Sequence, residues 1–239
     1  LAGPFFNAPP FLVEEVERIA IVGLAAGTTA RQATEIFGPI PIDGFEIDPE
    51  IIEVGRQYFG MTMPNLNAVA QDGRWGLEHS NYDYDLIAID AYRPPYIPWH
   101  LTTREFFEIA RDHLTDQGVV VINVGRAPND RSLIDALVTT LSQVFPSVHV
   151  MDIPVTFNSM VYATMQPTTY ENLANNFNSL VSTGDTHPVL LAAIDRVMTY
   201  RQPLPAATIV LTDDFAPIES IVNIMVLRFI FSGDLEKLQ

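Results

Sequence analysis

The sequence contains no cysteine, and this absence excludes several kinds of chemistry. A chain without cysteine forms no disulfide bond, binds no metal through thiolates and uses no cysteine nucleophile. It is also suited to a reducing compartment, so we expect a cytoplasmic location.

Basic residues are scarce as well. The 239 residues include 13 Lys and Arg against 29 Asp and Glu, which gives a formal net charge of -16. Such a surface repels a phosphate backbone, and nucleic acid is therefore excluded as a partner. The same charge suits cationic ligands such as polyamines, although an acidic surface also serves solubility alone.

Long hydrophobic runs are missing too. The longest late apolar run, residues 221–231, is interrupted by Asn223 and Arg228 and is too short to span a bilayer. The chain begins with Leu1 rather than Met, and we expect it to continue a longer protein, with its Pro-rich residues 1–17 irregular.

Apolar, β-branched runs alternate with segments of helical spacing through residues 18–166. The pattern predicts strands over residues 18–22, 42–47, 67–70, 85–90, 119–124, 148–153 and 159–165. It predicts helices over residues 28–37, 49–59, 101–114 and 130–144. This alternation is typical of an α/β fold with a doubly wound, mostly parallel, seven-stranded sheet. Residues 167–239 are helical in pattern and are interpreted as a C-terminal cap on one domain that comprises residues 1–239.

Small residues follow the first predicted strand. Gly23, Ala25 and Gly27 lie in a turn that allows a ligand to approach the backbone at a helix N-terminus. Turns that serve only packing look similar, so this feature alone does not distinguish a ligand-binding turn from a packing turn.

Carboxylates follow the next three strands. Glu46 lies where an acidic side chain accepts both hydroxyls of a ribose. Asp72 and Gly73 form either an ordinary Asp-Gly turn or a position from which Asp72 accepts a hydrogen bond from an adenine amino group. Asp90 ends the most apolar strand and either caps a nearby turn or enters the crevice at the sheet edge.

These motifs, in their order along the chain, resemble those of the spermidine synthase family of aminopropyltransferases. The resemblance covers about residues 18–126 and rests on 23–28, 46–50, 72–73, 84–90 and 101–107. It is closest to the spermidine synthase-like domains that are associated with or fused to membrane transporters, on the evidence of residues 90–95 and 211–217. It implies the Rossmann-like sheet of class I S-adenosylmethionine-dependent methyltransferases.

The resemblance also implies a reaction. Decarboxylated S-adenosylmethionine would donate an aminopropyl group to a small-molecule amine or polyamine. Glu46 would hold the ribose, Asp72 the adenine, and Asp90 would take a proton from the attacking amine, with Tyr92 on the substrate side. A sulfonium needs no metal to leave and the five histidines form no convincing ligand pair, so no metal is expected. A homodimer and a membrane-protein segment outside this chain are further expectations.

The sequence departs from the family pattern at two positions. Ala26 stands where the glycine-rich turn usually carries an Asp, and Arg93 replaces a second Asp beyond the proposed base. Asp213 and Asp214 precede a predicted helix. In one interpretation, one of them only caps that helix; in the other, the second one also faces the crevice and supplies the carboxylate that Ala26 lacks.

Two further functions stay open. Ala26 removes a carboxylate that would repel the methionine carboxylate, which favours a methyltransferase that uses intact S-adenosylmethionine. The third interpretation is a non-catalytic nucleoside-binding domain of a membrane protein, since a fold alone does not assign an activity.

Overall fold

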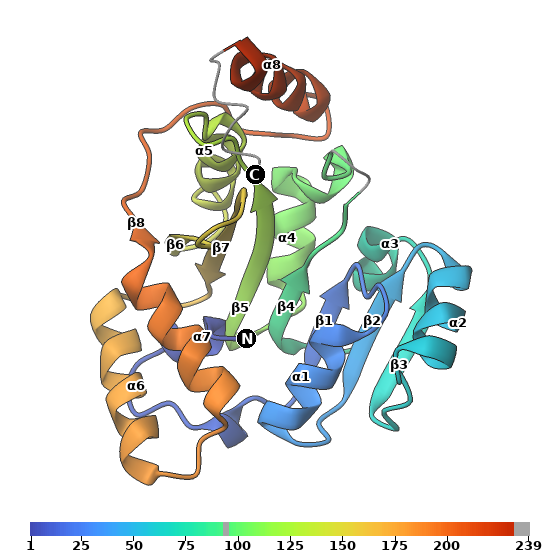
Figure 1. Ribbon diagram of the computed structural model, residues 1–239, viewed down its shortest axis with the longest axis vertical. Coiled ribbons are helices and arrows are strands. Elements are labelled where there is room, and N and C mark those ends of the chain that lie inside the picture. The colour runs from blue at the N-terminus through green and yellow to red at the C-terminus, as the bar shows by residue number, and fades with distance from the viewer. Residues whose placement is uncertain (93–95, 232–239) are drawn as a thin grey trace.

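Eight strands in the order β3-β2-β1-β4-β5-β7-β6-β8 form one twisted sheet in the computed structural model, which describes residues 1–92 and 96–231 (Figure 1). The strands are β1 (Ile19–Val22), β2 (Ile42–Glu46), β3 (Leu66–Ala70), β4 (Tyr84–Ile89), β5 (Leu114–Gly125), β6 (Ser147–Asp152), β7 (Asn158–Thr164) and β8 (Arg201–Gln202). The helices are α1 (Thr28–Phe37), α2 (Pro49–Tyr58), α3 (Gly73–Glu78), α4 (Arg104–Asp112), α5 (Ser132–Leu141), α6 (Tyr170–Thr183), α7 (Pro188–Thr199) and α8 (Ile218–Phe231), with the short 3-10 helices η1 (Gly3–Phe6), η2 (Val13–Glu15) and η3 (Trp99–Leu101).

Strands β1 to β5 are parallel to one another, whereas β7 pairs antiparallel with β5 and β6. The doubly wound α/β fold expected from the sequence is thus confirmed, and all seven predicted strands are present. The eighth strand, β8, pairs through only two residues with β6. A strand of that length carries no periodicity, so the sequence pattern does not reveal it.

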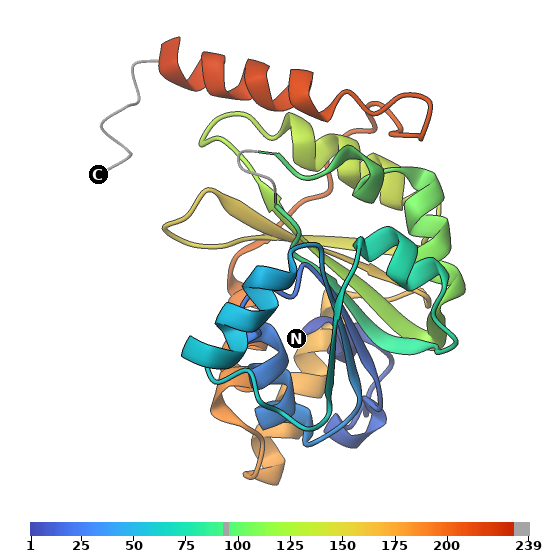
Figure 2. The same cartoon turned by 90° about the vertical axis from the view of Figure 1, so that its right-hand side faces the viewer.

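The sheet is covered on both faces, and its central strand β1 is apolar throughout. All four residues of β1 are buried, which is the pattern of a parallel strand between two layers of helices. Helices α1, α2, α6 and α7 belong to the core on one face, while α3, α4, α5 and α8 belong to the core on the other. Figure 2 shows the sheet nearly edge-on between these two layers.

The N-terminal segment has no strand or α-helix among residues 1–17, only the short turns η1 and η2, yet it is part of the core. Phe5 and Phe6 are 0% exposed, and a Cβ atom added to Gly3 would lie 2.9 Å from a methyl group of Val121 on β5. The side chain of Asn176 on α6 donates hydrogen bonds to the backbone oxygens of Phe5 and Asn7 and accepts one from the N–H of Phe11. The tight fit explains why position 3 is a glycine.

The C-terminal helices divide between two places and do not form one cap. Helices α6 and α7 pack against each other, and α6 also contacts η1, whereas α8 packs on α5 at the opposite end of the molecule (Figure 1). Val222 and Met225 of α8 are buried there, and Arg228 forms an ion pair with Asp130. Over the described residues, no helix combines the length and apolar character needed to cross a membrane.

Candidate active site

The turn after β1 is built so that it touches the end of β4. Gly23 has a φ of 87°, and a Cβ atom placed on it would lie 2.5 Å from the backbone oxygen of Asp90. Gly27, with a φ of 79°, leaves no room for a side chain beside Met61. Glycine at both positions is therefore required by backbone conformation and by close packing.

Glu46 fixes the middle of the same turn. Its Oε2 accepts a hydrogen bond from the backbone N–H of Ala25 at 2.9 Å, and its Oε1 accepts one from the N–H of Asp48 at 3.2 Å. Ala25 has a φ of 48°, a conformation that a residue with a side chain adopts only when its surroundings hold it. The buried carboxylate of Glu46 thus shapes the turn, and each oxygen retains a second acceptor position.

Asp72 caps helix α3. Its Oδ1 accepts hydrogen bonds from the backbone N–H groups of Arg74 and Trp75, at 3.0 and 3.1 Å. Its Oδ2 lies 2.9 Å from Nε2 of His100 in η3. The carboxylate therefore has a structural role as a helix N-cap, and its role toward an adenine ring stays a prediction.

Gly73 is explained by packing. A Cβ atom at this position would lie 2.4 Å from a methyl group of Val22, and one at Gly76 would lie 2.4 Å from the ring of Phe45. Helix α3 consequently lies directly on β1 and β2, which holds Asp72 at the carboxyl edge of the sheet.

Asp90 follows β4 at the same edge and is exposed. Its Oδ1 accepts a hydrogen bond of 3.0 Å from the side-chain amide of Asn123 on β5. The hydroxyl of Tyr92 donates to the backbone oxygen of Asn123, and burial together with the charge of Asp90 raises the pKa of that phenol above its usual range. The site around Asp90 thus consists of two neighbouring strand ends. Arg93 lies outside the described residues.

Asp213 is paired with a cation. Arg74 contacts both of its carboxylate oxygens at 2.7 Å, and the Thr103 hydroxyl donates to Oδ1 at 2.7 Å. The hydrogen bond from Arg74 lowers the pKa of this carboxyl. Asp213 lines a cavity of about 400 Å³ beside Trp99. Asp214 is exposed. The pairing therefore gives Asp213 a structural role, which joins α3 to the segment before α8.

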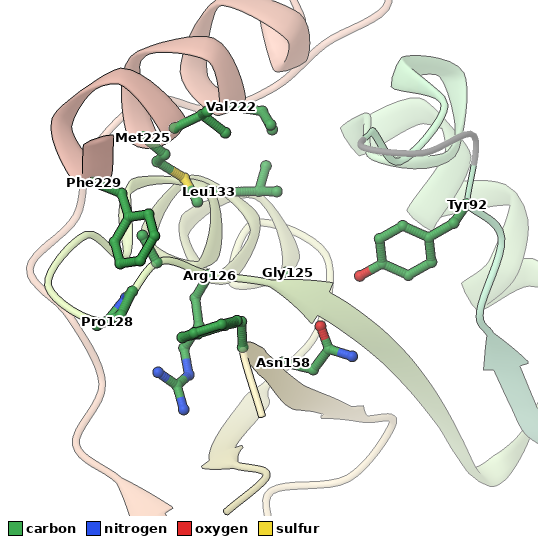
Figure 3. A pocket seen from close by; sticks show the side chains of 12 residues that line it. Tyr92, Gly125, Arg126, Pro128, Leu133, Asn158, Val222, Met225 and Phe229 are labelled. Atoms are coloured by element: carbon green, nitrogen blue, oxygen red, sulfur yellow. The ribbon is translucent and has the colours of Figure 1, made fainter. Parts of the chain in front are cut away.

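A larger, mainly apolar pocket of about 440 Å³ opens beside Tyr92 (Figure 3). Leu133 of α5 and Val222, Met225 and Phe229 of α8 line it. This pocket requires α8, which is distant in sequence from the strand ends, so the order of motifs along the chain does not reveal it.

The sequence interpretation also missed Asn123. The residue is the one polar member of the apolar run at 119–124, and this position at a strand end was the signal that could have found it. In the part of the chain that the structure describes, no three His, Asp or Glu side chains are grouped so as to hold a metal ion.

A family model described as "Spermine/spermidine synthase domain" matches residues 6–176. Two curated relatives are similar over most of the chain. A probable polyamine aminopropyl transferase of Bifidobacterium longum is 30% identical over 92% of this chain and 52% of its own length. A polyamine aminopropyltransferase of Vibrio vulnificus is 29% identical over 91% of this chain and 72% of its own length. The chain thus spans about half of the first relative.

A solved structure shares the fold. Human methyltransferase-like protein 13, in complex with SAH, superposes with a TM-score of 0.64 at 22% identity, and the match covers 85% of this chain and 92% of that one. At that identity the similarity shows a common architecture, here a methyltransferase-type Rossmann-like sheet.

Proposed function

Because the chain belongs to the spermine/spermidine synthase domain family, we propose that it transfers an aminopropyl group from decarboxylated S-adenosylmethionine to an amine. The observation that carries this proposal is the contact between the Gly23 turn and the backbone of Asp90. A nucleoside bound over the turn would have its reactive group next to a carboxylate at the edge where parallel sheets bind their ligands.

Glu46 and Asp72 are proposed to bind the nucleoside. The residues present suit this role, since Glu46 is fixed beside the exposed Ala25 and keeps an acceptor position on each oxygen for the ribose hydroxyls. Asp72 is held by α3 and His100, so its carboxylate needs little reorganisation to accept from an adenine amino group.

The donor, when bound, supplies a carbon next to a positively charged sulfur, which the acceptor nitrogen attacks while the carbon–sulfur bond breaks towards sulfur. Asp90 is proposed to take the proton that the nitrogen must lose. Asn123 holds the carboxylate through its amide N–H, which leaves the second oxygen of Asp90 for the amine. Tyr92 is proposed to line the acceptor side.

Ala26 favours a second candidate, methyl transfer from intact S-adenosylmethionine. The methyl side chain of Ala26 provides no charge to pair with the ammonium group of a decarboxylated donor. It also does not repel the carboxylate of intact S-adenosylmethionine. The shared fold with a methyltransferase that was solved with SAH is consistent with this alternative.

Calorimetric titration tests the two candidates directly. The protein is titrated with decarboxylated donor, intact S-adenosylmethionine and methylthioadenosine, and release of methylthioadenosine is then followed with a panel of amines. Tighter binding of the decarboxylated donor together with turnover supports aminopropyl transfer. Preference for the intact donor supports methyl transfer, while binding without turnover across all amines supports a nucleoside-binding domain.

A further inference from the structure

The apolar pocket beside Tyr92 has a composition that does not suit a second ammonium group. Leu133, Phe157, Val222, Met225 and Phe229 provide most of its wall, and its volume is about 440 Å³. Pockets of this size hold small organic groups, and apolar walls favour groups that lose water on entry.

The polar groups that line the pocket carry no negative charge. Among the described residues that form its wall there is no carboxylate. Tyr92 and Asn158 offer a hydroxyl and an amide. Arg126 is the one charged lining residue in this part of the chain, and its guanidinium points away from Met225 and Leu133 (Figure 3). The Arg126 guanidinium donates a hydrogen bond to the backbone oxygen of Thr156, and its Nε lies 3.5 Å from a carboxylate oxygen of Asp152.

A diamine would therefore place its far ammonium group in this wall without a counter-ion among the described lining residues. Burying an unpaired charge is strongly unfavourable, whereas an alkyl or aromatic group is stabilised by the same wall. The pocket thus selects against the second charge of a diamine.

The pocket is joined to Asp90 by two hydrogen bonds. Tyr92, in its wall, donates to the backbone oxygen of Asn123, and the Asn123 amide donates to Asp90. Asp90 and the pocket wall are thus linked through Asn123 and Tyr92, so a group bound at Asp90 lies near the pocket.

We propose that this pocket holds the apolar tail of a monoamine acceptor, such as an arylalkyl or alkyl amine, whose reacting nitrogen lies at Asp90. The inference rests on the proposed aminopropyl transfer. In that reaction the nitrogen forms a bond to the aminopropyl carbon, the carbon–sulfur bond breaks with its electron pair on sulfur, and the nitrogen proton passes to Asp90. The product is a secondary amine with one apolar arm.

The first test compares acceptors of each class. Methylthioadenosine release is measured with phenethylamine and hexylamine against putrescine and cadaverine, at fixed donor concentration. We expect kcat/KM for the monoamines to exceed that for the diamines at least about tenfold, since a hydrophobic pocket discriminates by roughly that factor or more.

A matched pair of variants locates the binding site. Val226 lines the pocket and is partly exposed, whereas its neighbour Leu227 does not line it and is half exposed. Val226→Trp should fill the pocket and raise KM for phenethylamine about tenfold or more, with methylthioadenosine affinity unchanged. Leu227→Trp, the control, should behave as the parent, and thermal unfolding of both variants verifies folding.

The outcomes separate this inference from the proposed function. Preferred turnover of diamines, unaffected by Val226→Trp, overturns the pocket assignment and leaves aminopropyl transfer intact. If no amine reacts, aminopropyl transfer fails, and phenethylamine is titrated into protein saturated with methylthioadenosine. Binding that Val226→Trp abolishes supports the pocket as an amine site, and absence of binding overturns it.

Discussion

The side-chain amide of Asn123 donates its hydrogen bond to Asp90, while its own Oδ1 is buried and has no hydrogen-bond partner among the described residues. An unpaired buried oxygen is unfavourable, so the orientation of this amide is maintained by the carboxylate that it faces. The Asn123 amide thus fixes the position of one oxygen of the Asp90 carboxylate.

Replacement of Asp90 tests the proposed base. Asp90→Asn keeps the shape of the side chain but removes the proton acceptor, so turnover should fall by about 10²–10⁴ with donor affinity little changed. Steady-state rates and calorimetry measure the two quantities. Asp83→Asn, an exposed carboxylate just before β4, is the matched control. Near-normal turnover of Asp90→Asn would exclude Asp90 as base.

Glu46→Gln tests the nucleoside site. A glutamine has one acceptor oxygen, so it cannot satisfy both Ala25 N–H and Asp48 N–H and also receive two ribose hydroxyls. Methylthioadenosine affinity should weaken by about 1.5–3 kcal/mol, which is roughly 10- to 100-fold. Calorimetry measures the change, with Glu50→Gln on the exposed start of α2 as control. Equal affinities of parent and variant would remove Glu46 from the site.

Asn176 should be essential for stability. It is 0% exposed, donates to the backbone oxygens of Phe5 and Asn7, and accepts from the N–H of Phe11. Asn176→Leu leaves three polar groups unsatisfied, so the free energy of unfolding should fall by about 3–5 kcal/mol. Urea unfolding measures it, and Asn178→Leu, exposed on the same helix, is the control. A loss below about 1 kcal/mol would show that the hydrogen bonds of Asn176 to residues 5–11 are not essential for stability.

His149 should make the protein less stable in acid. The imidazole is 7% exposed and stacks on Phe6 with ring centroids 4.1 Å apart, and burial lowers its pKa from 6.5 to about 4. Below pH 6.5 the unfolded chain binds a proton that the folded chain does not, so the free energy of unfolding should fall as pH drops towards about 4, by roughly 3 kcal/mol in total.

His149→Phe retains a ring against Phe6 but cannot be protonated, so denaturant unfolding between pH 7 and pH 4.5 should show a smaller loss of stability than in the parent. His79→Phe replaces an exposed imidazole that stacks on Trp75 and is the matched control. Parallel pH profiles of His149→Phe and parent would refute the assignment.

Local patterns predicted the sheet well because each strand carries its own signal. The run at 42–47 ends within one residue of β2, and the capping pair Asp48-Pro49 begins α2 as expected. The burial of the N-terminal segment was not predicted, because no local signal indicates it. Its prolines give no periodicity, and its burial depends on Asn176, whose position in space no local pattern reveals.

The sequence places the candidate residues at strand ends, as the structure has them, but it does not reveal their pairings, and their roles stay predictions. Strand ends locate Glu46 and Asp90 because parallel strands share one ligand edge. The partner of Asp213, by contrast, is Arg74 at a separation of 139 residues. No local pattern links such residues, so a carboxylate expected to face the crevice was found in an ion pair.

The burial of Gly3–Phe6 has a consequence for synthesis on the ribosome. These residues are made well before one of the groups that hold them, because Asn176 lies 171 residues from Phe5. A contact of that sequence separation closes late, after most of the chain has been made. Phe5 and Phe6 therefore stay without the cover of α6 in the nascent chain until that helix has been made. We expect this interval to be the time when the protein is most exposed to aggregation and most dependent on chaperones.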